Sequence, residues 1–235
     1  MSNPILVIGA LGNVGAEVVK HPLSKGKMVR AADINVIKLK EKFGDSVESV
    51  RFDFTDPASY AATFHDVKKM FYMRPPHLTN IERDMNPSMD VAKQAGVIHV
   101  VFLSLIGIEN AKYVPHYNVE TYLHKINLQT TFLGCSFFMQ NLNSAHRKEI
   151  KERNEIFVPV GNAKTSFIDV RDIGASHENQ PTKRNQIFER ENAAKRNVAT
   201  RQPARDGLLL ICELILPKQV VLDAFQIGFA HSRFQ

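Results

Sequence analysis

The sequence predicts an α/β fold: a doubly wound parallel sheet of the Rossmann type, with a small C-terminal lobe that is truncated or aberrant. Three observations predict it. Short apolar runs alternate with helical patterns, a glycine-rich turn follows the first run, and the character of the chain changes after Ala175. Strand–helix–strand repetition at this spacing is typical of a parallel sheet with right-handed crossovers. We therefore expect a Rossmann domain over residues 1–175 and an atypical segment over residues 176–235, partly disordered or substituting for a second lobe.

The composition is that of an ordinary globular protein. The chain has 235 residues, of which 44% are hydrophobic and 23% charged, and its net charge is +6. The positive charge fits an acidic partner or simply favours solubility. Two cysteines are too few for a disulfide scaffold or a cysteine metal site, and we expect no bound metal. Neither a signal peptide nor a bilayer-spanning apolar run is recognisable, so we expect a cytoplasmic protein without membrane contact.

Seven apolar runs are the expected strands. Several are nearly continuous Val, Ile, Leu and Phe, which is the pattern of strands buried on both faces of a sheet. The runs cover residues 5–8, 28–32, 47–52, 69–73, 99–104, 130–133 and 156–160.

Helical signals lie between these runs. Asp56 precedes Pro57, which places a preferred N-cap residue before a proline at the first helical position. Thr79 and Glu82 have the spacing of a capping box, and we expect the helix that they open to continue to about Gly96.

Gly9, Gly12 and Gly15 follow the first apolar run and enter a helix, which is the context that a dinucleotide-binding turn requires. In such a turn the first glycine makes a tight bend, the second lets backbone N–H groups approach a pyrophosphate, and the third lets helix and strand pack closely. The helix N-terminus adds partial positive charge. The alternative is a turn without ligand. The expected cofactor contacts in this stretch are Gly9, Leu11, Gly12, Asn13, Val14 and Gly15.

Asp33 stands eighteen residues after Gly15, at the end of the second expected strand. Its carboxylate is placed to accept hydrogen bonds from the adenosine ribose hydroxyls. A carboxylate there repels the 2′-phosphate of NADP, although the nearby Arg30, Lys38 and Lys40 counter this repulsion. The sequence therefore predicts NAD or NADP as the cofactor and favours NAD.

Asp53 follows the third expected strand and is placed to meet the adenine edge, with Phe54 beside it. We count both among the cofactor-binding residues. The alternative for Asp53 is that its carboxylate only caps a turn.

Several stretches together resemble the NmrA-like family of atypical short-chain dehydrogenase/reductases, over about residues 4–175. They include "ILVIGALGNVG", "VRFDFTDPAS", "MRPPH", "PHYNVETYL", "TFLGCSFFMQNL" and "FVPVGNAKTSFIDVRDI". The resemblance implies a Rossmann domain with a small C-terminal substrate lobe, and binding of NAD or NADP. It also implies either reduction of quinones or azo compounds, as in some members, or cofactor sensing without catalysis, as in others.

The usual catalytic pair of short-chain dehydrogenases, Tyr-x-x-x-Lys, is absent, because none of the five tyrosines is followed four residues later by lysine. Ser104 stands where the resemblance places the family's serine, with His116 at the tyrosine's place and Glu120 at the lysine's. We name these three as the candidate catalytic residues. His116 and Glu120 would form an acid/base pair if both begin the same helix; the alternative is a surface His–Glu pair.

Four residues form the candidate substrate wall. By the resemblance they lie beside the nicotinamide, and an aromatic and methionine wall with an amide end suits a flat acceptor. Ordinary core with a helix cap is the alternative. The residues are Phe137, Phe138, Met139 and Gln140.

Two further residues have less specific signals. Cys135 is either a redox-sensitive thiol or, as we prefer, a buried structural cysteine. Arg74 follows the fourth expected strand, so it either meets a phosphate or substrate or, by default, is solvated.

The family pattern fails after Ala175. Relatives continue into an apolar helix, whereas here the polar residues 177–180 follow almost at once. We hypothesise a deletion followed by a frame change, which leaves apolar surface that residues 208–216 partly cover.

The sequence thus supports three functions. The first is an NAD(P)H-dependent reductase of a flat, quinone-like acceptor. The alternative is a non-catalytic NAD(P)-sensing redox regulator that binds a protein partner. The third is a protein similar to nucleotide-sugar epimerases, which the missing Tyr-x-x-x-Lys disfavours most. Nucleic acid is not an expected partner, because the basic tail lacks interleaved aromatic residues and a helix-turn-helix pattern.

Overall fold

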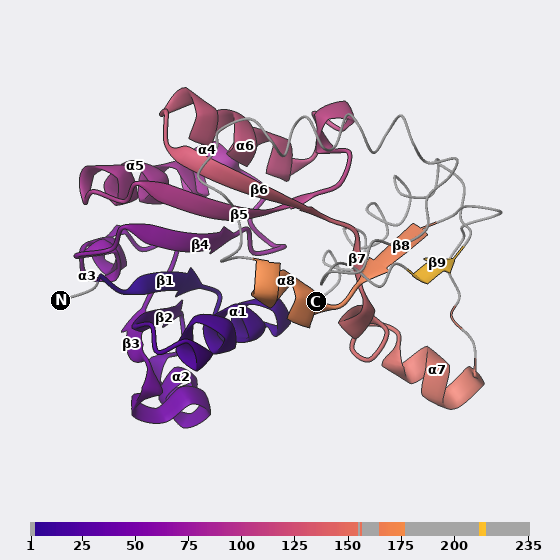
Figure 1. The fold of residues 1–235 in the computed structure, drawn as a ribbon. Helices are drawn as coiled ribbons and strands as arrows, with labels where there is room; N and C mark the ends of the chain where they lie inside the picture. The colour runs from indigo at the N-terminus through magenta and orange to yellow at the C-terminus, as the bar shows by residue number, and fades with distance from the viewer. Residues whose placement is uncertain (1–2, 155, 157–164, 177–211, 215–235) are drawn as a thin grey trace.

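The computed structural model describes residues 3–154, 156, 165–176 and 212–214. Most of the expected strand at 156–160 and most of the segment 176–235 lie outside these residues. From β1 (Ile5–Ile8) to β6 (Gln129–Cys135), strands and helices follow one another in turn (Figure 1). The alternation that the sequence predicts is therefore confirmed for this part of the chain.

Six parallel strands form one sheet in the order β3-β2-β1-β4-β5-β6. The winding direction reverses between β1 and β4, as in a doubly wound Rossmann fold, and the predicted fold class is confirmed. Each strand coincides with an expected apolar run to within two residues at either end. The remaining strands of this sheet are β2 (Val29–Asp33), β3 (Glu48–Arg51), β4 (Lys69–Met73) and β5 (His99–Leu105).

Helices cover both faces of the sheet (Figure 1). One apolar cluster joins the sheet to the helices that follow β3, β4 and β5, and a second joins it to α1, α2 and α8. The helices on the first face are α3 (Tyr60–Phe64), α4 (Ile81–Asp84), α5 (Asn86–Gln94) and α6 (Pro115–Lys125). Those on the second face are α1 (Asn13–Ser24), α2 (Val36–Phe43) and α8 (Val170–Ser176).

The strands have apolar residues on both faces because the side chains alternate between the two clusters. Along β4, Met70 and Tyr72 belong to the first cluster and Phe71 to the second, and all three are fully buried. A period of two places successive side chains on opposite sides of a sheet. This is why the runs read as continuous apolar sequence rather than as alternating apolar and polar residues.

The helix expected between Thr79 and Gly96 consists of two helices. Asn80, not Thr79, is the N-cap of α4, since its side chain accepts a hydrogen bond from the N–H of Arg83 at 3.0 Å. A second helix, α5, begins at Asn86 with proline in its first turn. Proline lacks the N–H that would continue the ladder from α4, so the chain restarts there.

The cap expected at Asp56 is confirmed, but it opens a shorter element. The carboxylate accepts from the N–H of Ala58 at 3.1 Å, and Pro57 begins a single 3-10 turn, Pro57–Ser59, which leads into α3.

A second, smaller sheet follows the Rossmann strands. Here β7 (Phe137–Phe138) pairs in parallel with β8 (Thr165–Ile168), and β8 pairs antiparallel with β9 (Cys212–Leu214). Between β7 and β8 lies the charged helix α7 (Arg147–Arg153). A strand from the atypical segment therefore pairs with a strand that precedes residue 175.

Helix α8 packs closely against α1. A Cβ atom on Gly174 would lie 2.8 Å from the backbone carbonyl of Glu17, so only glycine permits this approach. Among the described residues, no helix is long and apolar enough to cross a membrane. Over the same residues, no three side chains of His, Cys, Asp or Glu gather in a way that would hold a metal ion.

Candidate functional site

The first turn of the site is bent at Gly9, which has a φ of +73°. Its N–H donates to the carbonyl of Ala32 in β2 at 2.9 Å, and its own carbonyl accepts from the N–H of Gly12 at 3.0 Å. A Cβ on Gly9 would lie 2.7 Å from Sδ of Met73. Glycine is therefore favoured here by the backbone conformation, and a larger residue would also require the flexible side chain of Met73 to move.

Gly15 permits the close contact between α1 and this turn. A Cβ atom there would lie 2.1 Å from the carbonyl oxygen of Gly9, whereas one on Gly12 would lie 3.3 Å from the same oxygen. The third glycine thus has the packing role that its position in the motif predicts.

The N-terminus of α1 offers free hydrogen-bond donors. Gly12 is the N-cap residue, and within the described chain no side chain caps this end and no acidic residue lies in the first turn. The first N–H groups of a helix have no partner inside the helix and carry partial positive charge. Gly12 and Asn13 are exposed at this end of the helix, whereas Val14 is buried in the core. These features fit the pyrophosphate of a dinucleotide.

Asp33 is tied to the glycine turn. Its Oδ2 accepts a hydrogen bond from the N–H of Leu11 at 3.2 Å. The carbonyl of the same Leu11 accepts from Nζ of Lys42 at 3.2 Å. Lys42 comes from the last turn of α2 and does not belong to any motif that the sequence shows. Packing of α2 beside the turn brings it to the site, and no local signal predicts that.

One of the three cations expected to offset the charge of Asp33 is engaged elsewhere. Arg30 is only 6% exposed, and its guanidinium pairs with Glu48 at 2.8 Å and donates to the carbonyl of Thr63 at 3.1 Å. The expectation that Arg30 counters Asp33 is therefore wrong, because its guanidinium is bound to Glu48 of β3 and to a backbone carbonyl of α3. Lys38 and Lys40 are exposed on α2.

The structure favours the turn-capping alternative for Asp53. Its Oδ1 accepts from the N–H of Thr55 at 2.9 Å and from the hydroxyl of Thr55 at 2.8 Å. Phe54 is buried, with its ring 4.7 Å from that of Phe52 and 5.5 Å from that of Tyr72. The side chain of Phe54 is therefore core, and only its backbone is left for the predicted cofactor contact.

Ser104 and Glu120 are joined. The hydroxyl of Ser104, at the end of β5, donates to Oε1 of Glu120 in α6. Ser104 is 1% exposed and Glu120 is partly buried, so the bond is partly shielded from solvent. The serine proton is thus given to a carboxylate of the protein rather than presented to a substrate.

His116 lies on the same helix as Glu120, which is the condition for the expected acid/base pair, but it is buried. It is 9% exposed, its Nδ1 has no hydrogen-bond partner, and its ring lies 6.0 Å from that of Phe102. Burial, with a smaller contribution from Arg74, lowers the pKa of His116 to about 3. The imidazole is therefore neutral near pH 7, and the alternative of a surface His–Glu pair is wrong.

Arg74 is not solvated, contrary to the default expectation. Its Nη1 donates to the carbonyls of Pro75, Pro76 and Leu78 at 2.9, 3.0 and 2.8 Å. Burial lowers its pKa to about 10, and its Nε has no partner. The guanidinium thus holds the loop after β4 together through three backbone carbonyls, and it lies near His116.

The expected substrate wall is partly structural. The side-chain amide of Gln140 donates to Oδ1 of Asp169 at 3.0 Å and accepts from the N–H of Val170 at 3.1 Å. Phe138 packs against the second core cluster, and Phe137 lies 6.3 Å from the ring of Phe167. Met139 begins the short 3-10 turn after β7 and is partly buried.

Cys135, at the end of β6, is buried as predicted, and this burial raises the pKa of its thiol to about 12.

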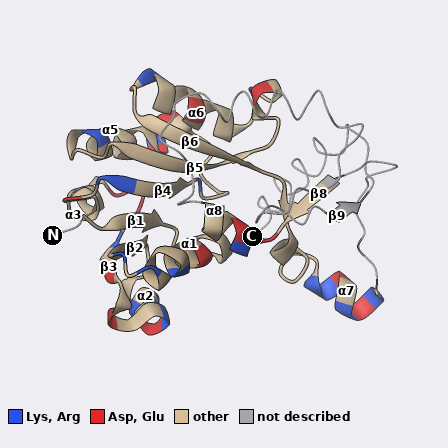
Figure 2. Ribbon diagram, in the orientation of Figure 1, with Lys and Arg blue, Asp and Glu red and all other residues tan. Residues whose placement is uncertain are grey.

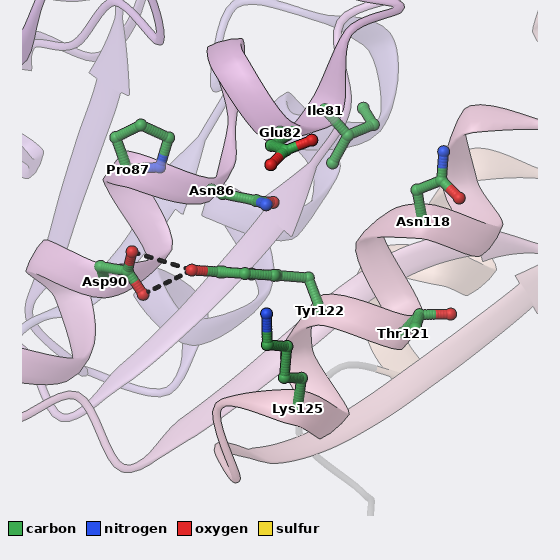
Figure 3. A pocket seen from close by; sticks show the side chains of 9 residues that line it. All are labelled: Ile81, Glu82, Asn86, Pro87, Asp90, Asn118, Thr121, Tyr122 and Lys125. Atoms are coloured by element: carbon green, nitrogen blue, oxygen red, sulfur yellow. Dashed lines mark hydrogen bonds between the residues drawn. The ribbon is translucent and has the colours of Figure 1, made fainter.

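A separate hollow of about 590 Å³ lies between α4, α5 and α6 (Figure 3). Tyr122 reaches across it and donates its hydroxyl to the carboxylate of Asp90, with O···O distances of 2.9 and 2.8 Å. None of the predicted site residues lines it. The residues that line it are Ile81, Glu82, Asn86, Pro87, Asp90, Asn118, Thr121, Tyr122 and Lys125.

Comparison with known families decides the affiliation. A family model described as the NmrA-like family matches residues 1–192. The chain belongs to the NmrA-like family. The match continues past residue 175, where the resemblance seen in the sequence ends, and it includes the first part of the atypical segment.

Curated relatives are only partly covered by the chain. The NAD(P)H azoreductase of Xenophilus azovorans is 30% identical over 193 residues, which are 75% of this chain and 65% of the relative. The prestalk A differentiation protein A of Dictyostelium discoideum is 29% identical over 173 residues, which are 72% of this chain and 56% of the relative. The chain thus spans less than two thirds of the length of either protein.

Solved structures share the fold. The triphenylmethane reductase of Citrobacter sp. in complex with NADP(H) gives a TM-score of 0.62 at 22% identity, covering 73% of this chain and 62% of that one. The NADPH-dependent quinone oxidoreductase QOR2 of Escherichia coli in complex with NADPH gives 0.63 at 18% identity, covering 74% and 62%. At this level of identity the likeness shows the architecture alone.

Proposed function

We propose that this chain binds NAD or NADP at the glycine turn and is an NAD(P)H-dependent reductase of a flat, quinone-like acceptor. The observation that carries the proposal is the contact between Gly15 and the carbonyl of Gly9, which lets the uncapped N-terminus of α1 stand directly behind the turn. An azoreductase that uses NAD(P)H is among the relatives.

Different residues along the carboxyl edge of the sheet would bind different parts of the cofactor. The N–H groups at the start of α1 would hold the pyrophosphate, and Asp33 the adenosine ribose. The nicotinamide would extend across the switch point between β1 and β4, toward Arg74, Ser104 and His116. When bound, the nicotinamide supplies a hydride.

Ser104 and His116 would help to position an acceptor, but they are poor proton donors to it. The hydroxyl of Ser104 is committed to Glu120, and the neutral imidazole of His116 is a weak acid near pH 7. A quinone needs little acid assistance because it is a good electrophile, and water completes its protonation. This chemistry fits a site that lacks Tyr-x-x-x-Lys better than reduction of a simple ketone would.

A second candidate, a cofactor-sensing regulator without catalysis, is favoured by one specific observation. Both groups placed to donate a proton, Ser104 and His116, are buried. Such a protein would bind the dinucleotide and pass the redox state to a protein partner. The epimerase-like alternative lacks the tyrosine and lysine on which that reaction depends.

Two measurements on the full chain separate these functions. Calorimetric titration with NAD, NADH, NADP and NADPH tests binding, and oxidation of NADH and NADPH with a panel of quinones tests turnover. Binding with quinone-dependent oxidation supports the reductase. Binding without turnover rejects the reductase in favour of the regulator, and failure to bind any of the four rejects both.

A further inference from the structure

Leu11 connects two opposite charges through its backbone. Its N–H donates to Asp33 and its carbonyl accepts from the ammonium of Lys42, both at 3.2 Å. Leu11 lies inside the glycine turn, between Gly9 and Gly12. The ammonium of Lys42 is therefore at the turn itself, although the residue belongs to the far end of α2.

The position of Asp33 identifies what lies nearby. In a Rossmann fold, the acid at the end of the second strand meets the 2′ position of the adenosine ribose, and a cation beside it accommodates a 2′-phosphate instead. Asp33 ends β2, and it is one of the charges that act on Lys42. Lys42 and Asp33 bind the backbone of the same residue, Leu11. The ammonium of Lys42 therefore lies near the 2′ position, where NAD and NADP differ.

We propose that Lys42 is a specificity-determining residue that lets this site accept a 2′-phosphate beside Asp33. This inference rests on the proposed function, because it concerns the same cofactor. Asp33 then serves the ribose diol of NAD(H), and Lys42 serves the phosphate of NADP(H). The site takes both dinucleotides rather than NAD alone.

Other cations near the turn are engaged elsewhere or are exposed nearer the start of α2. Arg30 of β2 is buried and pairs with Glu48, and Lys20 of α1 pairs with Glu17 at 2.7 Å. Figure 2 shows that α1 and α2 each carry acidic and basic residues, so net charge alone does not select a candidate. Burial lowers the pKa of Lys42 most and Lys20 lowers it further, while Glu17 and Asp33 raise it. The position of Lys42 at the turn is given by its hydrogen bond to the carbonyl of Leu11.

The test compares Lys42→Gln with Lys40→Gln, a matched change on the same helix. Dissociation constants are measured by calorimetry for NADPH and NADH. They are also measured for adenosine 2′,5′-bisphosphate and adenosine 5′-monophosphate, which differ only in the 2′-phosphate. Thermal unfolding of each variant confirms that it is folded. We expect Lys42→Gln to weaken NADPH and the bisphosphate about tenfold relative to their partners, as for loss of one charged hydrogen bond. Lys40→Gln is expected to leave both ratios unchanged.

The other outcomes overturn the inference in distinguishable ways. If Lys42→Gln weakens binding of both dinucleotides equally, Lys42 only supports the turn. If it weakens binding of neither, Lys42 has no part in cofactor binding. If the wild-type protein binds NADH but not NADPH, the site excludes the phosphate and the proposed function survives. If it binds neither dinucleotide, the proposed function itself fails.

Discussion

A Cβ atom on Gly15 would lie 2.1 Å from the carbonyl oxygen of Gly9, a distance that no side chain tolerates. Gly15→Ala must therefore separate α1 from the turn. We expect a loss of about 3 kcal/mol or more in the free energy of unfolding, as for severe overpacking, and loss of dinucleotide binding. Urea unfolding and calorimetric titration measure the two effects.

The control for that change is Gly26→Ala. Gly26 has a φ of +68°, but a Cβ atom there would have nothing within 4 Å, so alanine costs only backbone strain of about 1 kcal/mol. Gly26→Ala is expected to bind dinucleotide normally. Equal loss of binding in both variants would mean that the contact between Gly15 and Gly9 is not what shapes the site.

The bond between Ser104 and Glu120 fastens β5 to α6. Ser104→Ala leaves the carboxylate without this donor in a partly shielded position, and we expect a loss of about 1–3 kcal/mol. Ser24→Ala is the control, because its hydroxyl donates to the carbonyl of His21 at an exposed site. The stability of the two variants in urea should differ clearly, and similar losses would show that the bond between Ser104 and Glu120 contributes no more than an exposed one.

His116 makes the stability of the protein depend on pH. Its folded pKa of about 3 lies below the ordinary value of 6.5, so below pH 6.5 the unfolded chain binds a proton that the folded chain does not. Stability then rises with pH across this window, and at pH 5 the penalty is about 2 kcal/mol relative to pH 8.

His116→Gln is expected to flatten that dependence, as measured by urea unfolding between pH 5 and pH 8. His65→Gln, at an exposed position, is the matched control and should follow the wild type. An unchanged slope in His116→Gln would contradict the burial of a neutral imidazole at this position.

Gln140 ties the turn after β7 to the start of α8. Gln140→Leu removes the bonds to Asp169 and to the N–H of Val170, and we expect a loss of about 1–2 kcal/mol. Because the same turn carries the candidate substrate wall, the variant should also raise the KM for a quinone more than it lowers kcat. Gln94→Leu, at an exposed position near the end of α5, is the control, and the same KM change there would show that the turn has no special part in acceptor binding.

The Rossmann sheet was predictable because its strands have a signal in their own sequence. Runs such as residues 69–73 are apolar on both faces, and that pattern belongs to a parallel sheet covered by helices. The glycine spacing was equally informative, since the roles of Gly9 and Gly15 follow from local geometry. The split between α4 and α5 was missed because a proline at residue 87 fits both a helix start and a kinked helix.

Charges at the site were less predictable because their partners are distant in sequence. Arg30 has the right spacing to offset Asp33, yet its guanidinium is bound to Glu48 and to a backbone carbonyl near residue 63. Lys42 reaches the turn only through the packing of α2. The burial of His116 likewise depends on how α6 lies against β5, which a helical pattern does not specify.

The central claim is that the backbone N–H groups at the start of α1 hold the pyrophosphate. Amide NMR of the labelled protein, titrated with NADPH, tests it most directly. We expect the largest shifts at Asn13, Val14 and Gly15, with smaller ones at Leu11. Shifts that spare these amides and gather instead around Asp90 and Tyr122, in the hollow between α5 and α6, would contradict it.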